Sequence, residues 1–599
     1  MKIFTALGII TAGLCLGVAG QARAQHCQIQ PILELPITMV GSRPVMTGKV
    51  NGAEAQFMVD SGAYYSLMSR AAAKQYQLHL VMAREGFYLE GVGGPVQAWV
   101  ATVKQFSLGG QVAPNIEFMV GGNDFGNGLA GVLGQNILTA NADTDYDLAT
   151  GIVRLIRPHD CSTTDLAYWA GSKPHSAISI EVTNQEHPHT RGDAYLNGQA
   201  IKVTFDTGAS VSTLSKEAAA RLGVTPDSPG VVEGGTALGI GAHPVRTWIA
   251  PFPSFKIGAE EVRNARLRFS DTELPDCDML LGADFFLSHH IYVASGQRKL
   301  YFTYNGGPVF KPYDAALAAS APVPPAAAGD AQPKPEPGEL ADADGYARRG
   351  AASSARHDYV HALADLTRAC ELAPKEATYL YERAMLYLQV SQPVPARADL
   401  DLALDIKPDY LQALMLRSDL RYRAGDKTGA AADIDAAEHL APKESANRMQ
   451  IAYMYGNLGR MPEAVAQWDL WIASHTQDAG LPEALSERCW TKAVALRDLD
   501  HALADCNRAL RLRPDFAPFL EARALLKFRR GEYRESLADY DSAQKLDSKP
   551  HGNAVWTHYV RGLDLLKLGR AAEGQAEIDA ATKLRPKVVE DLGKYGIGP

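Results

Sequence analysis

Hydrophobic and polar positions along the chain change their period near residue 342. Before that point, short runs rich in β-branched and apolar residues stop at turn residues, which predicts β-strands. Beyond it, apolar residues recur at the spacing of amphipathic helices. The chain is therefore expected to be multidomain, with an all-β part followed by an all-α part.

One predicted strand occurs twice in matching form. Residues 55–59 and 200–205 each follow an Asn-Gly turn, and each ends at an Asp-Ser/Thr-Gly-Ala tetrapeptide that begins at Asp60 or Asp206. A segment rich in Ala, Lys and Arg follows each copy and predicts helices over 67–75 and 214–222. One such triplet is a weak signal, because average residue usage produces it about once in a couple of thousand positions. Two copies are a specific signal only if their surroundings also agree.

The surroundings agree in order and kind. Each copy is followed by a Gly-rich stretch, a hydrophobic-hydrophobic-Gly motif and a closing strand pair, at 91–94, 132–134 and 144–156 in the first half and at 239–241, 280–282 and 290–302 in the second. We interpret residues 25–165 and 166–305 as the two halves of a duplicated β domain. A linker over 168–188 is expected to run into the first strand of the second half, over 177–183.

A second repeat is present in the helical part. Pro374, Pro408 and Pro442 are 34 residues apart, with Ala at fixed offsets before each, and Pro514 and Pro586 repeat the frame. The pattern resembles the tetratricopeptide repeat, which has this length. The resemblance implies about seven stacked helix pairs over 342–599, with small residues where the two helices of a pair cross closely.

One repeat departs from the others. The unit from Arg448 lacks its terminal Pro, has Trp468 and Trp471 where other units have Leu and Ala, and is followed by a short insertion at 476–481. Between the β part and the repeats, residues 306–341 are rich in Ala and Pro. Such a segment cannot bury a core and is expected to be a semi-extended linker.

The duplicated β part resembles retropepsin-like (gag-pol-like) aspartic proteases over about residues 30–305. Each half of that family contributes the same three motifs, and viral members assemble the site from two identical subunits. This chain carries both halves in tandem, as pepsin-like enzymes do. The resemblance implies an aspartic endopeptidase with Asp60 and Asp206 as the catalytic residues.

The chemistry of such a pair explains the neighbouring residue types. Two carboxylates within hydrogen-bonding distance share one proton, so one can act as general base on a water while the other polarises the scissile carbonyl. No metal or other cofactor is needed. The loops that carry the two aspartates are expected to be supported by Ser61, Gly62, Thr207 and Gly208. Two flaps are expected to close over a bound peptide, and they include Gly91, Gly93, Gly94, Gly239 and Gly241.

Alternatives remain open for both parts. The β halves could instead be a degenerate pair that binds peptides without cutting them, in a non-enzymatic scaffold whose repeats carry the function. Tetratricopeptide arrays bind peptides or partner proteins in a concave groove, which implies recruitment of a substrate or partner, and the alternative is a spacer. A net charge of −9, from 59 basic and 68 acidic residues, argues against a nucleic-acid surface.

The N-terminus indicates export. Lys2 precedes an apolar run over 3–19 and an Ala-Arg-Ala site, which predicts a signal peptide over 1–24. The alternative is an uncleaved anchor helix. We expect a periplasmic protein, or else a secreted one, without stable membrane insertion after cleavage. Export permits disulfides: Cys27 and Cys161 flank the first half and are a plausible bridge, whereas Cys489 and Cys506 could equally be core thiols or a bridge.

Several other polar residues are expected to have structural roles. The alternating Asp143, Asp145 and Asp147 are expected on a solvated strand face. We interpret Asp284 as a capping or turn carboxylate, and His289 and His290 as residues without the partners that a metal site requires. The linker histidines His187 and His189 are expected at the surface.

Overall fold

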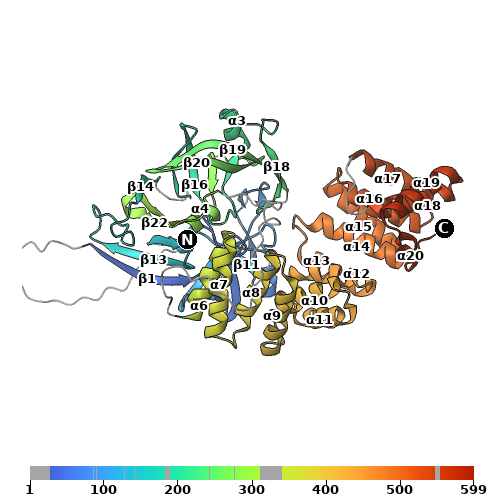
Figure 1. The fold of residues 1–599 in the computed structure, drawn as a ribbon, viewed down its shortest axis with the longest axis horizontal. Helices are drawn as coiled ribbons and strands as arrows, with labels where there is room; N and C mark the ends of the chain where they lie inside the picture. The colour runs from blue at the N-terminus through green and yellow to red at the C-terminus, as the bar shows by residue number, and fades with distance from the viewer. Residues whose placement is uncertain are drawn as a thin grey trace, which may run out of the picture.

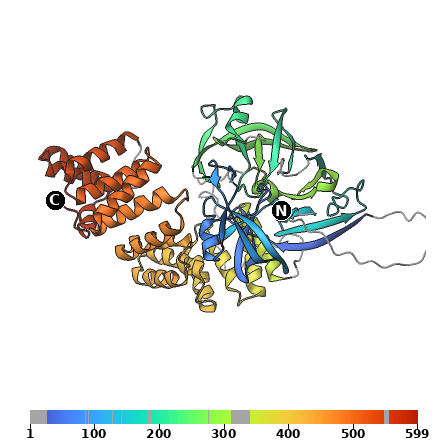
Figure 2. The ribbon, with the colours of Figure 1, turned by 180° about the vertical axis from the view of Figure 1, so that it is seen from behind.

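The computed structural model describes residues 27–310, 340 and 342–598, apart from 85, 90, 127, 140–141, 182–188, 242, 275–276 and 547–553. The expected signal peptide and His187 lie outside these residues, as does the Ala- and Pro-rich segment at 311–339. Figure 1 shows the β part as one body with the helical part extending to one side of it, and Figure 2 shows the same arrangement from behind. No helix within the described ranges is long and apolar enough to cross a membrane.

The first half is built on an eight-stranded sheet whose six central strands close into a barrel. Closure comes from pairing between β3 and β9. In sheet order the strands are β2 (Thr38–Val40), β3 (Arg43–Val50), β4 (Ala53–Val59), β11 (Leu129–Leu133), β5 (Leu67–Met68), β10 (Gln111–Val120), β9 (Trp99–Leu108) and β6 (Leu80–Met82). A separate hairpin, β7 (Tyr88–Leu89) and β8 (Val96–Gln97), projects from it.

The second half repeats this topology. Its barrel closes through pairing between β15 and β19. In sheet order the strands are β15 (Arg191–Leu196), β16 (Gln199–Phe205), β21 (Met279–Leu281), β17 (Thr213–Ser215), β20 (Glu260–Ser270), β19 (Val245–Ile257) and β18 (Val232–Ala237). The strands of the two barrels follow the same order, which confirms the duplication predicted from the motifs.

The helices expected after each tetrapeptide are shorter than predicted. The first residues of each segment form the short inner strands β5 and β17, and only then do α1 (Arg70–Gln75) and α3 (Lys216–Arg221) begin. Ser69 and Ser215 cap these helices by accepting a hydrogen bond from the N–H three residues on. The N-cap serines, and not the Ala-rich composition, therefore determine where the helices start.

A six-stranded sheet joins the two halves. In order it contains β1 (Gln28–Pro36), β13 (Ile152–His159), β12 (Asp143–Asp147), β22 (His289–Ala294), β23 (Lys299–Tyr304) and β14 (Ser176–Ser179). The halves meet where β12 pairs with β22, at Thr144 opposite Val293 and Tyr146 opposite Ile291. Strand β14 is the expected first strand of the second half, shorter than predicted. A disulfide between Cys27 and Cys161 ties the outer end of this sheet, as expected.

The expectation that the acidic residues of β12 face solvent was wrong for two of the three. Asp143 and Asp145 are 5% and 0% exposed. Asp145 accepts hydrogen bonds from the Tyr168 hydroxyl and faces His290 Nε2, both at 2.5 Å. Asp143 accepts from the Tyr292 hydroxyl and the N–H of Ser295. These carboxylates are buried because β12 is an inner strand of the joining sheet, a long-range pairing that the alternation could not reveal.

The helical part contains seven antiparallel pairs among the described residues. The first helices are α6 (Ala343–Ala355), α8 (Ala377–Gln389), α10 (Leu411–Arg423), α12 (Asn447–Asn457), α14 (Leu481–Ala495), α16 (Ala517–Arg529) and α18 (Ala554–Lys567). Their partners are α7 (Tyr359–Leu372), α9 (Pro393–Ile406), α11 (Lys427–Leu440), α13 (Met461–Ser474), α15 (Leu499–Leu512), α17 (Tyr533–Leu546) and α19 (Ala571–Leu584), and α20 (Val588–Gly593) ends the array. The small residues of the repeat frame are fully buried at the crossings, as Ala362, Ala396 and Ala430 illustrate.

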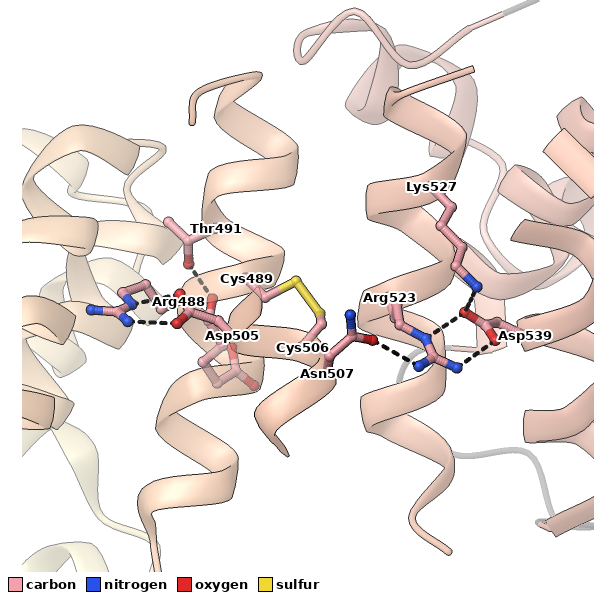
Figure 3. The surroundings of a disulfide bond; sticks show 10 residues. Arg488, Cys489, Thr491, Asp505, Cys506, Asn507, Arg523, Lys527 and Asp539 are labelled. Carbon is pink, nitrogen blue, oxygen red and sulfur yellow. Dashed lines mark hydrogen bonds and ion pairs between the residues drawn. A yellow bond between two sulfur atoms is a disulfide. The ribbon is translucent and has the colours of Figure 1, made fainter. Parts of the chain in front are cut away.

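Five of the units share an ion pair that the sequence pattern did not single out. An Arg of the first helix donates two hydrogen bonds to an Asp of the second, in Arg349–Asp365, Arg383–Asp399, Arg417–Asp433, Arg488–Asp505 and Arg523–Asp539. Such bidentate pairs fix geometry as well as adding energy. In one of these units a disulfide joins Cys489 to Cys506, beside the pair of Arg488 and Asp505 (Figure 3).

The array is packed directly against the β part. Helix α6 lies on β2, and Ala351 and Ala352 enter the same core as Leu35 and Ile37. Further along, α13 packs against α1, where Arg70 Nη1 donates to Gln477 Oε1 at 2.8 Å. The Ala- and Pro-rich composition predicts a semi-extended linker between the two parts, and the described residues on either side of it are packed together at these contacts and at the loop between α13 and α14.

Candidate active site

Each candidate aspartate stands at the end of an inner barrel strand. Asp60 follows β4, and its N–H donates to Leu133 O at 3.0 Å. Asp206 follows β16, and its N–H donates to Leu281 O at 2.9 Å. The accepting carbonyls belong to β11 and β21, the parallel neighbours that carry the hydrophobic-hydrophobic-Gly motifs. These motifs therefore hold the aspartate loops in place.

The carboxylates are fixed by their own loops. The N–H groups of Gly62 and Ala63 donate to Asp60 Oδ1 at 2.9 and 3.0 Å. Gly208 and Ala209 donate to Asp206 Oδ1 at 2.9 and 3.1 Å. Each aspartate thus has one oxygen held by two backbone donors and the other left for its partner or a substrate.

The two loops are bonded to each other through Ser61 and Thr207. The N–H of Ser61 donates to Thr207 Oγ1 at 3.0 Å, and the N–H of Thr207 donates to Ser61 Oγ at 3.0 Å. Each hydroxyl in turn donates across the interface, Ser61 to Phe205 O and Thr207 to Val59 O. Both side chains are almost fully buried. These four bonds fix how the two aspartates face each other.

Gly62 and Gly208 are required by close approach. A Cβ at Gly62 would meet the carboxylate of Asp206, and a Cβ at Gly208 would meet that of Asp60. The glycines therefore allow each loop to reach the opposite carboxylate, in addition to allowing the turn. This reciprocal contact shows that the two tetrapeptides form one shared site.

The environment favours a shared proton. Burial raises the pKa of Asp60 well above its usual range, and the neighbouring carboxylate of Asp206 raises it further. Burial also raises the pKa of Asp206, although its hydrogen bonds act in the opposite direction. Since two adjacent carboxylates cannot both ionise cheaply, the pair retains one proton to a higher pH than an isolated aspartate.

The two Gly-rich stretches lie against each other. The N–H of Gly241 donates to Val92 O at 2.9 Å, and that of His243 donates to Gly93 O at 3.2 Å. Side chains at Gly239 or Gly241 would collide with the backbone of Val92 or Gly93. Gly91 accepts a hydrogen bond from the N–H of Gly94 within the first stretch. The expected flap glycines are thus brought together, with each half supplying one tip.

A second matched pair of residues supports the loops from below. In the first half, Asn136 Oδ1 accepts from the N–H and the hydroxyl of Ser66, both at 2.8 Å. In the second half, Asp284 Oδ1 accepts from the N–H and hydroxyl of Ser212 at 2.9 and 2.6 Å. Asp284 therefore acts as the turn carboxylate expected. Burial raises the pKa of Asp284 to about 6, and its Oδ2 has no hydrogen-bond partner among the described residues.

Sequence reasoning missed three residues near the site. His189, expected at the linker surface, is close enough to Asp206 to oppose the rise in the pKa of that carboxyl. Gln135 donates to Ser61 O at 2.7 Å from the turn after β11. Asn123 donates to the carbonyls of Gly239 and Gly241. Gln135 directly follows a recognised motif, which was a usable signal, but nothing local marks His189 or Asn123.

Comparisons with known proteins agree with the two-part architecture. Residues 46–140 and 192–288 each match the family model described as "gag-polyprotein putative aspartyl protease". No curated protein matches the chain significantly.

Solved structures similar to the helical part include two that are described as tetratricopeptide repeat proteins. PilW, a widely conserved type IV pilus biogenesis factor, is 19% identical, with 36% of this chain and 97% of that chain covered and a TM-score of 0.29. A tetratricopeptide repeat protein from Parabacteroides merdae is 16% identical, with 42% and 98% covered and a TM-score of 0.33. YrrB, a TPR protein with an unusual peptide-binding site, is 16% identical, with 31% and 93% covered and a TM-score of 0.27.

Proposed function

We propose that this protein is an exported aspartic endopeptidase. The premise is that its two β domains belong to the gag-polyprotein aspartyl protease family and precede a tetratricopeptide repeat array. The observation that carries the proposal is the reciprocal approach of Asp60 and Asp206. Each carboxylate lies where a Cβ on the opposite loop's glycine would be. A purely structural duplication has no need for two buried acids at such close range.

The proposed reaction is direct attack of water on a peptide carbonyl. The ionised aspartate takes a proton from a water held between Asp60 and Asp206, while the protonated aspartate donates a hydrogen bond to the carbonyl oxygen. Attack forms a C–O bond and a tetrahedral intermediate. The amine then leaves with a proton from the dyad as the C–N bond breaks. The roles of the two residues exchange, and no metal or other cofactor takes part.

The flaps and the array are given accessory roles. The tips at Gly91–Gly94 and Gly239–Gly241 would cover a bound peptide and exclude water from the dyad. The array would recruit a protein substrate or partner through its concave face, as stacked helix pairs commonly do. We place the protein in the periplasm, or else outside the cell. Export is supported by the N-terminal signal pattern and is consistent with the two disulfides.

The test is cleavage of an unfolded protein by the full chain. The purified protein is incubated with a reduced, unfolded substrate, and new peptide termini are identified by mass spectrometry. The control is the double variant Asp60→Asn/Asp206→Asn. We expect new termini only with the unaltered protein. Equal products from both proteins would point to a contaminating protease, and no products from either would favour the non-enzymatic scaffold.

A further inference from the structure

The repeat array reaches the second flap through a single side chain. Asn123 lies in the loop after β10, which we define as the flap-support loop (residues 121–126). Its Nδ2 donates to Gly239 O at 2.6 Å and to Gly241 O at 2.8 Å, so both amide hydrogens are directed at the tip of the second flap. The loop of one half therefore holds the flap of the other.

The opposite side of the same side chain is held by the array. The N–H of Ala479 donates to Asn123 Oδ1 at 2.8 Å. One residue further along, the N–H of Asp124 donates to Asp478 Oδ2 at 2.6 Å. Ala479 and Asp478 belong to the connection between α13 and α14, which we define as the latch loop (residues 475–480). One planar amide thus links the latch loop to the flap tip.

The latch loop is rigidly built. His475 is 2% exposed, stacks on the ring of Trp471 at 4.3 Å, and has Nε2 3.4 Å from Asp124 Oδ2. Asp478 Oδ1 accepts from the N–H of Gly480, which orients the carboxylate whose other oxygen contacts the flap-support loop. A mobile surface loop would lack these internal bonds.

The latch loop coincides with the insertion that interrupts the repeat frame. The divergent unit supplies both Trp471, which supports His475, and the extra residues after Thr476. Trp471 also packs into the core of the array, with Leu481 and Leu485. Contact with the β part accounts for the insertion, because its residues Asp478 and Ala479 hold Asp124 and Asn123.

We propose that the latch loop restrains the second flap and so limits entry of peptides to the site. The tips are bonded to each other in this structure, and a peptide can reach the dyad only if they separate. Lifting the second tip breaks the two bonds from Asn123, whose orientation the array maintains. The array therefore inhibits flap opening in its own chain, and a protein bound to α13 or α14 can change this inhibition. This inference rests on the proposed function for its effect on cleavage but not for the physical link.

Two variants break the link at opposite ends. Asn123→Asp keeps the acceptor for Ala479 but replaces the donor to the flap with an oxygen that faces two carbonyls. Asp478→Ala removes the acceptor for the N–H of Asp124. The matched control is Gln477→Ala, because Gln477 lies in the same loop and contacts Arg70, whereas the hydrogen bonds to the flap-support loop among the described residues involve His475, Asp478 and Ala479.

The readouts are hydrogen exchange and cleavage by the full chain. In Asn123→Asp and Asp478→Ala, exchange of the Gly241 amide should rise about three- to tenfold, and kcat/KM for a short peptide should rise several-fold. Gln477→Ala should stay within about twofold of the unaltered protein in both. Circular dichroism confirms that each variant is folded.

The outcomes separate this inference from the proposed function. Unchanged exchange at Gly241 in both folded variants overturns the latch. Faster exchange with lower kcat/KM contradicts inhibition by the array, since the array would then be completing the site. Faster exchange in a protein that cleaves no peptide leaves the physical link supported and refutes the protease function.

Discussion

The side-chain oxygen of Ser61 accepts a hydrogen bond from the N–H of Thr207, and Thr207 Oγ1 accepts the corresponding bond from Ser61. This pair of hydrogen bonds joins two halves that differ in sequence, yet equivalent donor and acceptor atoms are used on both sides. It requires a hydroxyl on each loop, which both Ser and Thr provide. The halves could therefore diverge at these positions while the geometry of the aspartates was kept.

Removing the Thr207 hydroxyl should destabilise the joined halves. In Thr207→Ala, the buried N–H of Ser61 and the carbonyl of Val59 lose their partner, which costs about 1–3 kcal/mol in the free energy of unfolding. Thr207→Ser is the matched control, because it reproduces the residue of the first half. Urea titration measures both. Equal stability of the Ala and Ser variants would contradict a role for these bonds.

A methyl group on the catalytic loop should abolish activity. In Gly208→Ala the new Cβ would occupy the position of the Asp60 carboxylate, so the dyad must separate. Gly296→Ala is the control, because a Cβ there meets nothing within 4 Å. Peptide cleavage should be lost in the first variant and kept in the second. Full activity of folded Gly208→Ala would show that the two loops are not closely apposed during the reaction.

Cleavage should slow as the pH rises. Burial raises the pKa values of Asp60 and Asp206, and the Asp206 carboxylate raises that of Asp60 further, so the pair keeps its single proton into a higher range than isolated carboxyls and loses it above that range. The active form has one proton, so kcat/KM must have a descending alkaline limb. A rate that continued to rise with pH would exclude an aspartic mechanism.

Asp284 should make stability depend on pH. Its pKa of about 6 in the folded protein lies above the value of about 3.9 for an unfolded aspartate, so the folded state binds the proton more tightly. Below about pH 4 both states are protonated and there is no penalty. As the pH rises from about 4 to 6, the free energy of unfolding falls by about 2–3 kcal/mol, because the buried carboxyl must ionise in the folded protein.

Asp284→Asn should remove this loss. Asn136 occupies the matching position in the first half and accepts the same two bonds from its serine. The variant should therefore gain stability over the unaltered protein at pH 8 and show a smaller difference at pH 4. The urea midpoint of the β-domain transition at both pH values is the measurement. A difference independent of pH would contradict the buried ionisation.

Local patterns predicted much of this architecture. Two Asp-Ser/Thr-Gly loops, their glycines and the helix pairs all follow from residues close together in sequence, as does the frame of buried alanines such as Ala396. What the sequence did not reveal depends on contacts between distant segments. Asp145 looks like a solvated strand residue until β12 pairs with β22, which lies some 150 residues further on. Asn123 has no local signal, because its three partners, Gly239, Gly241 and Ala479, lie in other domains.

The irregular repeat was a local clue to one long-range contact. Its insertion and its Trp471 could be read from the sequence, but neither indicated which surface the loop would meet. Likewise, the linker composition predicted a boundary and said nothing about the packing of Ala352 into the β core. Composition reports whether a segment can form a core, not where its flanking domains dock.

The most direct test of the central claim is to replace each aspartate separately. Asp60→Asn and Asp206→Asn proteins are assayed for peptide cleavage alone and mixed in equal amounts. Because both halves of the joining sheet come from one chain, we predict that each folded variant loses at least about a hundredfold in kcat/KM and that the mixture stays inactive. Full activity in either variant would contradict the shared dyad, and activity recovered on mixing would show that the halves pair between chains.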